Sequence, residues 1–459
     1  MTDRLLEECT ALLGPQGILA PDVLAARTTH GLGAEGFKAR FGVRPASTGE
    51  VSRVLALCNQ HGVPVVTHGG LTGLTRGTFA DPACIVLSTE RMNSVLEVSA
   101  SQRVAVVQAG VILATLQEAA EAEGLFFPLD LGSRGSATVG GCLATNAGGN
   151  RVFRYGMMRD SVLGLEAVLA HGTVVSSMNR LIKNNAGYDL KPLFIGSEGT
   201  LGIVTQAVVR LRERPVSRCM ALVALADFEQ AGGLFKHMDG ALAGKLAAFE
   251  MMWSSFYKLV TTPPATSRPP LPQDHSFYVL IESLGADQER DQAQFEDVLA
   301  AAWDAGLIVD AAIAASQAQC QEFWHMRDDV QQFSRLGEVH AYDVSLPLDD
   351  MPAYVERVRV AAARDLPEAQ VWTYGHLGDN NLHVVITHEK PVDHAVYDAV
   401  VYTRLADYGG SISGEHGIGI DKKAWLPLCR NPAEIALMRT LKQTLDPRGT
   451  LNPNVLGLV

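Results

Sequence analysis

The sequence predicts an α+β protein of more than one domain. Its 459 residues exceed what one hydrophobic core ordinarily holds, so two or three domains are expected. From about residue 40 to 215, short β-branched runs alternate with helical stretches and glycine clusters, a pattern typical of layers of strands and helices. Beyond about residue 216 the glycines thin out while strands and long helical stretches continue. This second regime predicts a second α+β domain.

The changes in composition place the domain boundaries. We expect a first domain over residues 1–215, a second over 216–425 and a C-terminal segment over 426–459. The C-terminal segment reads as a helix that leads into a loop containing Gly449 and Pro453, because both residue types interrupt helices.

Composition and charge exclude several classes of function. The net charge is −12 and no basic stripe occurs, which argues against a nucleic-acid partner. No run of about 18 apolar residues occurs, which argues against a membrane span. The seven cysteines form no C-x-x-C pair and fit reduced thiols in a core. The start of the chain reads as an amphipathic helix and not as an export signal, so we expect a cytoplasmic protein.

Three glycine clusters mark the first domain. They are THGGLTGLTRGT after the strand-like VPVV, DLGSRGSATVGGCLATNAGG, and FIGSEGTLGIVT. Glycine lets the backbone turn its N–H groups onto one anion and lets a ligand approach the main chain. One such cluster alone is equally well a tight turn in a sheet, and the spacing does not match a nicotinamide-binding G-x-G-x-x-G. Three clusters together predict a large phosphate-bearing cofactor.

A group of histidines and one carboxylate marks the second domain. YGHLGDNNLH places His376 and His383 on either side of a turn, and SGEHGIG adds Glu415 and His416. Two imidazoles and a carboxylate with open positions suit Zn²⁺, Mn²⁺ or Fe²⁺. A strand that leaves the turn can direct both histidines inward. The alternative is that each histidine is a hydrogen-bonded structural residue.

The glycine segments resemble the FAD-binding half of the vanillyl alcohol oxidase and p-cresol methylhydroxylase superfamily. YGHLGDNNLHV, GEHGIGIDKKAWL and LDPRGTLNPN are similar to its D-2-hydroxyacid dehydrogenase branch, which includes D-lactate and D-2-hydroxyglutarate dehydrogenases and glycolate oxidase flavin subunits. The resemblance implies a p-cresol methylhydroxylase type FAD-binding domain of two α+β subdomains. It also implies an α+β substrate domain with an antiparallel sheet, and a C-terminal segment that returns to the FAD domain.

The resemblance implies that FAD contacts all three glycine clusters and the C-terminal segment. The implied residues are His68, Gly69, Gly70, Thr72, Gly73, Leu74, Gly132, Ser136, Thr138, Gly140, Gly141, Asn146, Gly148, Gly149, Glu198, Gly199, Gly202, Ile203 and Asn452. Some superfamily members bind FAD covalently through a histidine that follows the Gly-Gly pair. Here His68 precedes that pair, so we expect non-covalent FAD.

The resemblance also implies the catalytic residues. His376, His383 and Glu415 would bind a divalent metal, Zn or Mn, and His416 would act as the base. A D-2-hydroxy acid would bind the metal through its hydroxyl and carboxylate, lose its hydroxyl proton to His416 and pass its Cα hydrogen as hydride to flavin N5. The metal would also offset the general repulsion between an anionic substrate and a chain of net charge −12.

Two further residues are interpreted through the resemblance. Arg327 matches an arginine that binds the substrate carboxylate, and a planar guanidinium suits that contact. The alternative for Arg327 is a surface ion pair with Asp328 or Asp329. Relatives have glycine where this chain has Asn380, and asparagine tolerates the left-handed conformation, so we expect the turn to survive.

The substrate and partners are less tightly constrained. Positions that assist a second substrate carboxylate in 2-hydroxyglutarate dehydrogenases are Gln331, Ala341 and Val385 here. A buried charge without a partner is costly, so we expect a neutral side chain, as in D-lactate or a larger D-2-hydroxy acid. A 2-hydroxyglutarate dehydrogenase or a glycolate oxidase flavin subunit is the alternative.

Two interpretations from other classes stay open at this point, a metal hydrolase and a non-catalytic flavin electron-transfer subunit. The electron acceptor is left between an electron-transfer flavoprotein, a quinone and a cytochrome. A homodimer is kept open as the oligomeric state. FAD and the 2-hydroxy acid are the small molecules that the sequence leads us to expect.

Overall fold

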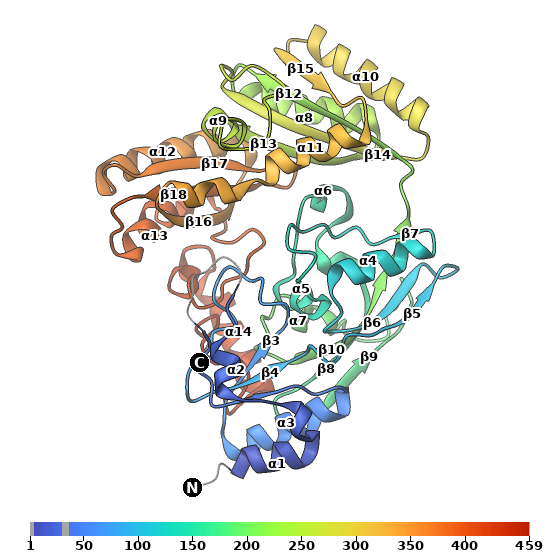
Figure 1. The fold of residues 1–459 in the computed structure, drawn as a ribbon, viewed down its shortest axis with the longest axis vertical. Coiled ribbons are helices and arrows are strands. Elements are labelled where there is room, and N and C mark those ends of the chain that lie inside the picture. The colour runs from blue at the N-terminus through green and yellow to red at the C-terminus, as the bar shows by residue number, and fades with distance from the viewer. Residues whose placement is uncertain (1–3, 30–35, 459) are drawn as a thin grey trace. The chain divides into compact units, whose positions relative to one another are not determined.

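The protein is described by a computed structural model over residues 4–29 and 36–458 (Figure 1). Its contacts divide the chain into two compact units. Unit 1 consists of Met1–Gly149, Gly156–Arg214 and Glu415–Val459, and unit 2 consists of Asn150–Tyr155 and Pro215–Gly414. Each unit combines helices with sheets, which confirms the predicted α+β class. By these contacts unit 2 ends at Gly414, whereas the change in composition places the end of the second domain at residue 425.

The first part of unit 1 is a small mixed sheet with helices. Its elements are α1 (Arg4–Leu13), β1 (Ile18–Leu19), α2 (Pro21–Ala25), β2 (Gly42–Val43), α3 (Thr48–His61), β3 (Val65–His68) and β4 (Ile85–Ser88). Within the described residues the strand order is β1-β2-β4-β3, with β3 and β4 parallel. Leu5, Val54 and Ile85 belong to the apolar core that joins α1 and α3 to the sheet.

The second part of unit 1 is an antiparallel sheet. Its elements are β5 (Val95–Ser99), β6 (Val104–Gln108), α4 (Leu113–Ala122), α5 (Val139–Thr145), β8 (Val162–Val168), β9 (Val174–Ser177), α7 (Lys191–Phe194) and β10 (Ile203–Arg210), with a separate pair β7 (Leu125–Phe126) and β11 (Arg212–Glu213). In the described part of the chain its five strands follow the order β5-β6-β10-β8-β9. The two sheets of unit 1 confirm the two predicted α+β subdomains.

The C-terminal segment packs within unit 1. Helix α14 (Pro432–Leu445) contains the buried Lys442, whose Nζ donates to the carbonyl oxygens of Thr200 and Leu451 at 2.9 and 2.6 Å. Leu451 forms a parallel bridge with Val65 on β3. A buried ammonium must find acceptors, and these contacts attach the end of the chain to two of its earlier parts.

Unit 2 is built on one wide antiparallel sheet. Its elements are α6 (Val152–Tyr155), β12 (Ser217–Leu225), α8 (Glu229–Leu242), β13 (Leu246–Trp253), α9 (Ser254–Thr261), β14 (Phe277–Gly285), α10 (Gln288–Asp304), β15 (Asp310–Ile313), α11 (Gln317–Asp328), β16 (Glu338–Ser345), α12 (Met351–Asp365), β17 (Gln370–His376), β18 (Asn381–His388) and α13 (His394–Tyr402). Over residues 4–29 and 36–458 its seven strands follow the order β15-β12-β14-β13-β17-β18-β16. All its pairings are antiparallel, as predicted.

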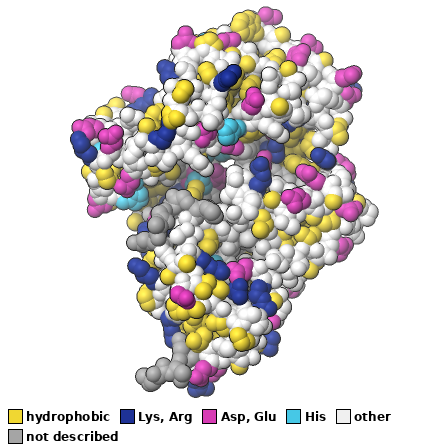
Figure 2. All heavy atoms as spheres, viewed as in Figure 1, with side chains coloured by type: hydrophobic (Ala, Val, Ile, Leu, Met, Phe, Trp, Pro, Cys, Tyr) yellow, Lys and Arg dark blue, Asp and Glu magenta, His cyan; other side chains and the backbone are white. Residues whose placement is uncertain are grey.

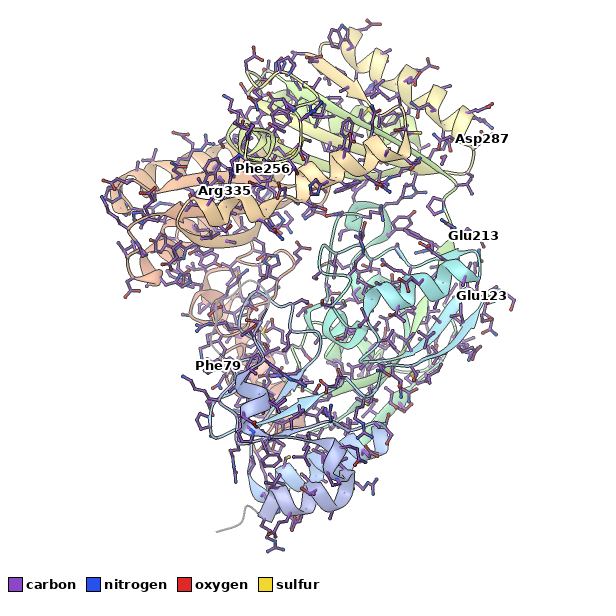
Figure 3. The ribbon with its side chains drawn as sticks, viewed as in Figure 1. Phe79, Glu123, Glu213, Phe256, Asp287 and Arg335 are labelled. Atoms are coloured by element: carbon purple, nitrogen blue, oxygen red, sulfur yellow. The ribbon has the colours of Figure 1, made fainter. Side chains whose placement is uncertain are left out.

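Helices cover both faces of this sheet. On one face, Phe256 of α9, which is labelled in Figure 3, belongs to a core that also includes Trp324 of α11. Phe256 stacks on Tyr374 of β17 with ring centroids 4.2 Å apart. On the other face, Phe235 of α8 contacts Phe249 of β13 at 5.2 Å. Successive residues of a strand point to opposite faces, so Glu250, next to Phe249, lies on the face that carries Tyr374.

The surface carries charges of both signs, and most of the thiols are buried. Lys and Arg side chains are interspersed with Asp and Glu side chains on the face drawn in Figure 2. No helix found between residues 4 and 458, outside the undescribed residues 30–35, combines the length and apolarity that crossing a bilayer requires. None of the seven cysteines, all of which lie among the described residues, forms a disulfide; six are buried and Cys429 is partly exposed.

Candidate active site

The hairpin between β17 and β18 places two histidines on one face of the sheet. Tyr374 lies opposite His383, and His376 lies opposite Asn381. Residues opposite each other in an antiparallel pair share a face, so both histidines point to the same side. Their ring centroids are 5.1 Å apart. The turn contains Asn380 with φ of 63°, which confirms that asparagine adopts the left-handed conformation here.

The third predicted ligand follows directly after unit 2. Residues 411–414 are held on β16, because Ser345 and Ser411 exchange backbone hydrogen bonds of 3.0 and 2.7 Å. Glu415 is the next residue after this segment. One ligand atom from each of His376, His383 and Glu415 lies within 4.8 Å of the other two. The donor set therefore fits a divalent metal: two imidazoles and a carboxylate can converge on one ion.

A buried carboxylate that the sequence analysis did not single out connects Arg327 and His376. Glu250 is 1% exposed and lies opposite His376 across β13 and β17. Its Oε2 accepts from Arg327 Nε at 2.9 Å and lies 2.8 Å from Nη2. Its Oε1 lies 2.8 Å from His376 Nδ1. Arg327 is itself buried, and its guanidinium lies over the Tyr374 ring at 5.1 Å. Because two of its nitrogens contact Glu250, Glu250 is its main charged partner.

The charges of this group stabilise one another. Burial by itself raises the pKa of Glu250, but His376 and Arg327 outweigh it and hold the pKa below its ordinary value. Burial by itself lowers the pKa of Arg327, and Glu250 more than compensates, so that pKa is raised. Glu250 and Arg327 thus form a buried ion pair of no net charge.

A second buried carboxylate lies on the neighbouring strand. Glu282 of β14 accepts from Arg151, Arg218 and the Trp324 indole at 2.9, 2.7 and 3.1 Å. It is fully buried, and its pKa lies below the ordinary value because the arginines outweigh the effect of burial. These three partners satisfy both oxygens of Glu282. The carboxylate therefore belongs to a separate group from Glu250, Arg327 and His376.

The loop that carries Glu415 and His416 belongs to unit 1. Glu198 accepts from the backbone N–H groups of Ile418 at 2.8 Å and of Gly419 at 3.0 Å. The N–H of Ile420 donates to the Thr75 carbonyl at 3.0 Å. Residues from the first and third glycine clusters therefore hold this loop.

The second glycine cluster reaches the same loop. The N–H of Gly149 donates to Glu415 Oε2 at 2.9 Å. His416 Nε2 lies 3.7 Å from Glu415 Oε1. All three clusters predicted to hold a cofactor thus also contact the segment that bears the predicted base.

Glu198 was predicted as a cofactor contact, and the structure gives its carboxylate another partner. It has a positive φ of 51° and is 8% exposed. Burial raises the pKa of Glu198 to about 7, against the lowering effect of the Gly419 and Ile418 N–H groups. The side chain is directed to the 415–420 loop.

The glycine clusters combine positions where a side chain would clash with positions that are open. A Cβ on Gly70 would lie 2.0 Å from the Ser136 carbonyl oxygen, and a Cβ on Gly69 would lie 2.6 Å from Thr138 Oγ1. The first cluster therefore packs its backbone against the start of α5. By contrast, a Cβ on Gly132 would meet nothing within 4 Å. Tight backbone packing beside open glycines is the arrangement that a backbone-bound cofactor needs.

Two other predicted cofactor residues are internal to unit 1. His68 is fully buried, lies 2.9 Å from the Thr78 carbonyl oxygen through Nε2, and has its pKa lowered to about 4 by burial. Asn452 donates to the carbonyl oxygens of Gly77 and Glu198 at 3.1 and 2.8 Å. Asn452 thus ties the C-terminal segment to the first and third clusters.

Glu250 and Glu282 were not predicted as site residues, although the sequence around each of them is unusual. Glu250 stands in LAAFEMMW and Glu282 stands in FYVLIESLG, each a lone charge in an otherwise apolar strand. A buried carboxylate requires cationic or hydrogen-bonding partners. Such a residue therefore indicates a polar site inside the sheet, although the sequence does not say which cation it meets.

Comparisons with known families agree with this architecture. The FAD-linked oxidase C-terminal domain matches residues 214–456, and the FAD binding domain matches residues 39–177. The first match covers more than half of the chain.

Named relatives match over most of their length. The chain is 39% identical over 443 residues to a mitochondrial D-2-hydroxyglutarate dehydrogenase of Bos taurus, covering 96% of this chain and 79% of the relative. It is 37% identical over 412 residues to the mitochondrial D-2-hydroxyglutarate dehydrogenase of Arabidopsis thaliana, covering 89% and 73%. Among solved structures, p-cresol methylhydroxylase with bound substrate superposes with a TM-score of 0.77 at 14% identity, covering 99% of this chain and 96% of the other. This likeness shows the fold.

The relatives overturn one expectation. We predicted a cytoplasmic protein, and that prediction is wrong: the matched dehydrogenases of Bos taurus and Arabidopsis thaliana are mitochondrial. The reasoning failed because it rested on the lack of a secretory signal pattern, which distinguishes exported proteins from retained ones. It does not distinguish the cytoplasm from an organelle.

Proposed function

The chain belongs to the FAD-linked oxidases, in their branch of D-2-hydroxyacid dehydrogenases, and from this premise we propose that it oxidises a D-2-hydroxy acid to the 2-oxo acid with the help of a divalent metal. The observation that supports the metal is the convergence of His376, His383 and Glu415, whose ligand atoms lie within 4.8 Å of one another. When bound there, a Zn²⁺ or Mn²⁺ ion would act as a Lewis acid that lowers the pKa of the substrate hydroxyl.

The buried arginine supports recognition of a carboxylate. Glu250 occupies Nε and Nη2 of Arg327, so we propose that the substrate carboxylate binds on the Nη1 side. The Nη1 atom also lies 3.4 Å from Asp328, whose side chain is 40% exposed. Substrate would replace or share that contact, because the guanidinium is a rigid fork of donors.

His416 is proposed to take the hydroxyl proton. It follows the ligand Glu415 in the chain, and its ring lies 3.7 Å from that carboxylate. A general base must lie within hydrogen-bond reach of the proton that it removes. The glycine loops that hold residues 415–420 keep this ring at a fixed distance from the glycine clusters of unit 1.

The glycine clusters are proposed to hold FAD without a covalent bond. His68 supports this, because it is fully buried against Thr78 and Phe37. When bound, FAD would supply the redox chemistry, as acceptor of the substrate Cα hydrogen in the form of hydride. The electron acceptor that reoxidises the flavin and the oligomeric state stay predictions.

The residues beside the histidines support a substrate with a neutral side chain. Val385 lies opposite Trp372 and Ala341 on neighbouring strands, two residues beyond His383 on the same face. None of the three carries a charge. A second buried carboxylate would lack a cation at these positions, which costs several kcal/mol. We propose D-lactate or a larger neutral D-2-hydroxy acid.

D-2-hydroxyglutarate is the second candidate. It is the substrate in the name of both matched relatives. The metal hydrolase interpretation has no support left, since the chain is an FAD-linked oxidase. The non-catalytic interpretation would require that an enzyme of this branch has lost its chemistry while retaining Arg327 and His416.

Anaerobic flavin reduction tests the proposal. The purified protein should contain FAD, and its flavin absorption should bleach on addition of a D-2-hydroxy acid and not of the L-enantiomer. Bleaching should stop after chelation of the metal and resume when Zn²⁺ or Mn²⁺ is added. Bleaching that survives complete metal removal would contradict the metal step, and a clear preference for D-2-hydroxyglutarate would select the second candidate.

A further inference from the structure

We infer that Glu250 is a positioning residue that fixes the tautomer of His376 and the orientation of Arg327, and that its loss weakens metal binding. This inference rests on the proposed function, because it concerns the same metal and the same substrate carboxylate. Glu250 itself would touch neither the metal nor the substrate.

The contacts of Glu250 determine which ring nitrogen of His376 carries the proton. Glu250 Oε1 lies 2.8 Å from His376 Nδ1. An ionised carboxylate can only accept hydrogen bonds, so Nδ1 must donate. A neutral ring protonated at Nδ1 presents its lone pair at Nε2, which is the nitrogen that a metal would use. A hydrogen bond from a ligating imidazole to a carboxylate also raises the basicity of the ligand.

The other oxygen of Glu250 orients the arginine. Oε2 is within 2.9 Å of both Nε and Nη2 of Arg327. Arg327 Nη2 in turn lies 3.4 Å from His376 Nε2. One carboxylate therefore positions both groups, and each of them is at most 5% exposed.

The sheet makes this arrangement rigid. Glu250 and His376 are direct partners across β13 and β17, near the middle of the seven strands formed by the described residues. Their side chains share a face because opposite residues in an antiparallel pair do so. A change of register would move both side chains, so the pair is fixed by backbone hydrogen bonds as well as by charge.

The ion pair has a consequence for substrate binding. Glu250 cancels the charge of Arg327, so the pair alone offers an anionic substrate no net positive charge. The metal then supplies the net positive charge that attracts the carboxylate. Substrate affinity should therefore depend on metal occupancy, and Arg327 should provide geometry more than attraction.

A matched pair of variants tests the inference. In Glu250→Gln one of the two carboxylate oxygens is replaced by an NH2 donor. The side chain therefore cannot accept on both the His376 side and the Arg327 side, which use different oxygens of Glu250. Metal affinity, measured by competition with a chromogenic chelator for Zn²⁺, should fall about 10- to 100-fold. Glu282→Gln is the control, because Glu282 is equally buried on the adjacent strand and bonded to two arginines. That variant should keep its Zn²⁺ affinity within about twofold of the unmodified protein, a limit set by the spread of such measurements.

Several outcomes would overturn the inference. The inference fails if Glu250→Gln binds Zn²⁺ as tightly as the unmodified protein. It also fails if Glu282→Gln loses as much Zn²⁺ affinity as Glu250→Gln, because that result would indicate general destabilisation. FAD content and the thermal midpoint of each variant report whether it folds. A failure of the unmodified protein to bind any metal would instead contradict the proposed function.

A second measurement determines the tautomer of His376 in the metal-free protein and does not require the Glu250 variant. In protein labelled with ¹⁵N-histidine, the His376 signals, assigned by their loss in His376→Gln, should report a proton on Nδ1. A His376 ring in the metal-free protein that carries its proton on Nε2 and none on Nδ1 would overturn the inference. The NMR result does not depend on whether the protein binds a metal, which the chelator experiment measures. A failure of this inference can therefore be distinguished from a failure of the proposed function.

Discussion

The two segments that supply the proposed metal ligands are built in different ways. The hairpin of β17 and β18 places His376 and His383 by strand register, with the cross-strand partners Asn381 and Tyr374 in the same short hairpin. The 415–420 loop has no regular structure over most of its length and is held by Glu198, more than 200 residues earlier in the chain. In the proposed metal site, two ligand positions are therefore set by local strand pairing and the third by long-range contacts.

The two segments should also fail in different ways. A substitution in the hairpin removes a ligand but leaves the sheet paired on both sides, since β18 lies between β17 and β16. A substitution in the loop's supports moves Glu415 and His416 together without touching either.

The largest effect is expected for His383→Ala. Removing one of three ligands should abolish metal binding and lower the rate of flavin reduction about 10³-fold, equivalent to about 4 kcal/mol of transition-state stabilisation. Metal stoichiometry and anaerobic stopped-flow measurements check this result. His388→Ala is the control, because His388 is buried on the same strand and contacts Tyr397 and Pro367 instead; that variant should keep its metal.

The second prediction concerns the buried carboxylate that supports the loop. The pKa of Glu198 is raised to about 7 in the folded protein, above its unfolded value of about 4.3. The folded state therefore binds the proton more tightly, so this group's stabilising contribution is fully present below the unfolded pKa. It is lost as the pH rises through about 7, a change of the order of 3 kcal/mol.

Urea unfolding at pH 5 and pH 8 measures this contribution. In Glu198→Gln the part of the pH dependence that Glu198 causes should disappear, so the variant should lose less stability between the two pH values than the unmodified protein. Identical losses in both proteins would show that Glu198 does not titrate in this range.

The third prediction separates loop position from ligand chemistry. Gly419 has a φ of 54°, and a Cβ there would lie 1.9 Å from the Thr75 carbonyl oxygen. Gly419→Ala should displace the loop and reduce turnover about 10- to 100-fold, because displacements of about 1 Å cost that much in catalysis. FAD should stay bound. Gly240→Ala in α8, where a Cβ would meet nothing within 4 Å, should leave turnover unchanged.

The smallest effect is expected in the hairpin turn. Asn380→Gly should change the free energy of unfolding by less than about 1 kcal/mol, because both residues tolerate a left-handed backbone. Asn380→Val should cost about 1–2 kcal/mol more, because a β-branched side chain is strained there. Chemical denaturation of the two variants compares them, and equal stabilities would contradict the assigned strain.

The sequence supported the α+β class because apolar periodicity reflects the faces that strands and helices bury. The antiparallel sheet of unit 2 was implied by the resemblance to the family. The sequence also supported the grouping of His376 with His383, because a turn of a few residues leaves little freedom in how two strands pair. The wrong prediction of location came from the lack of a secretory signal pattern, which does not distinguish the cytoplasm from an organelle.

The sequence by itself determined the ligand types, the glycine-rich backbone and the turn at Asn380, since each is a property of residues close together in the chain. Only the tertiary structure decided that Arg327 pairs with Glu250, and that Glu198 holds the segment after Glu415 in unit 1. The physical reason is that a buried charge must find a partner, but the chain does not state which one. That choice depends on the strand order and on contacts between residues that are far apart in sequence.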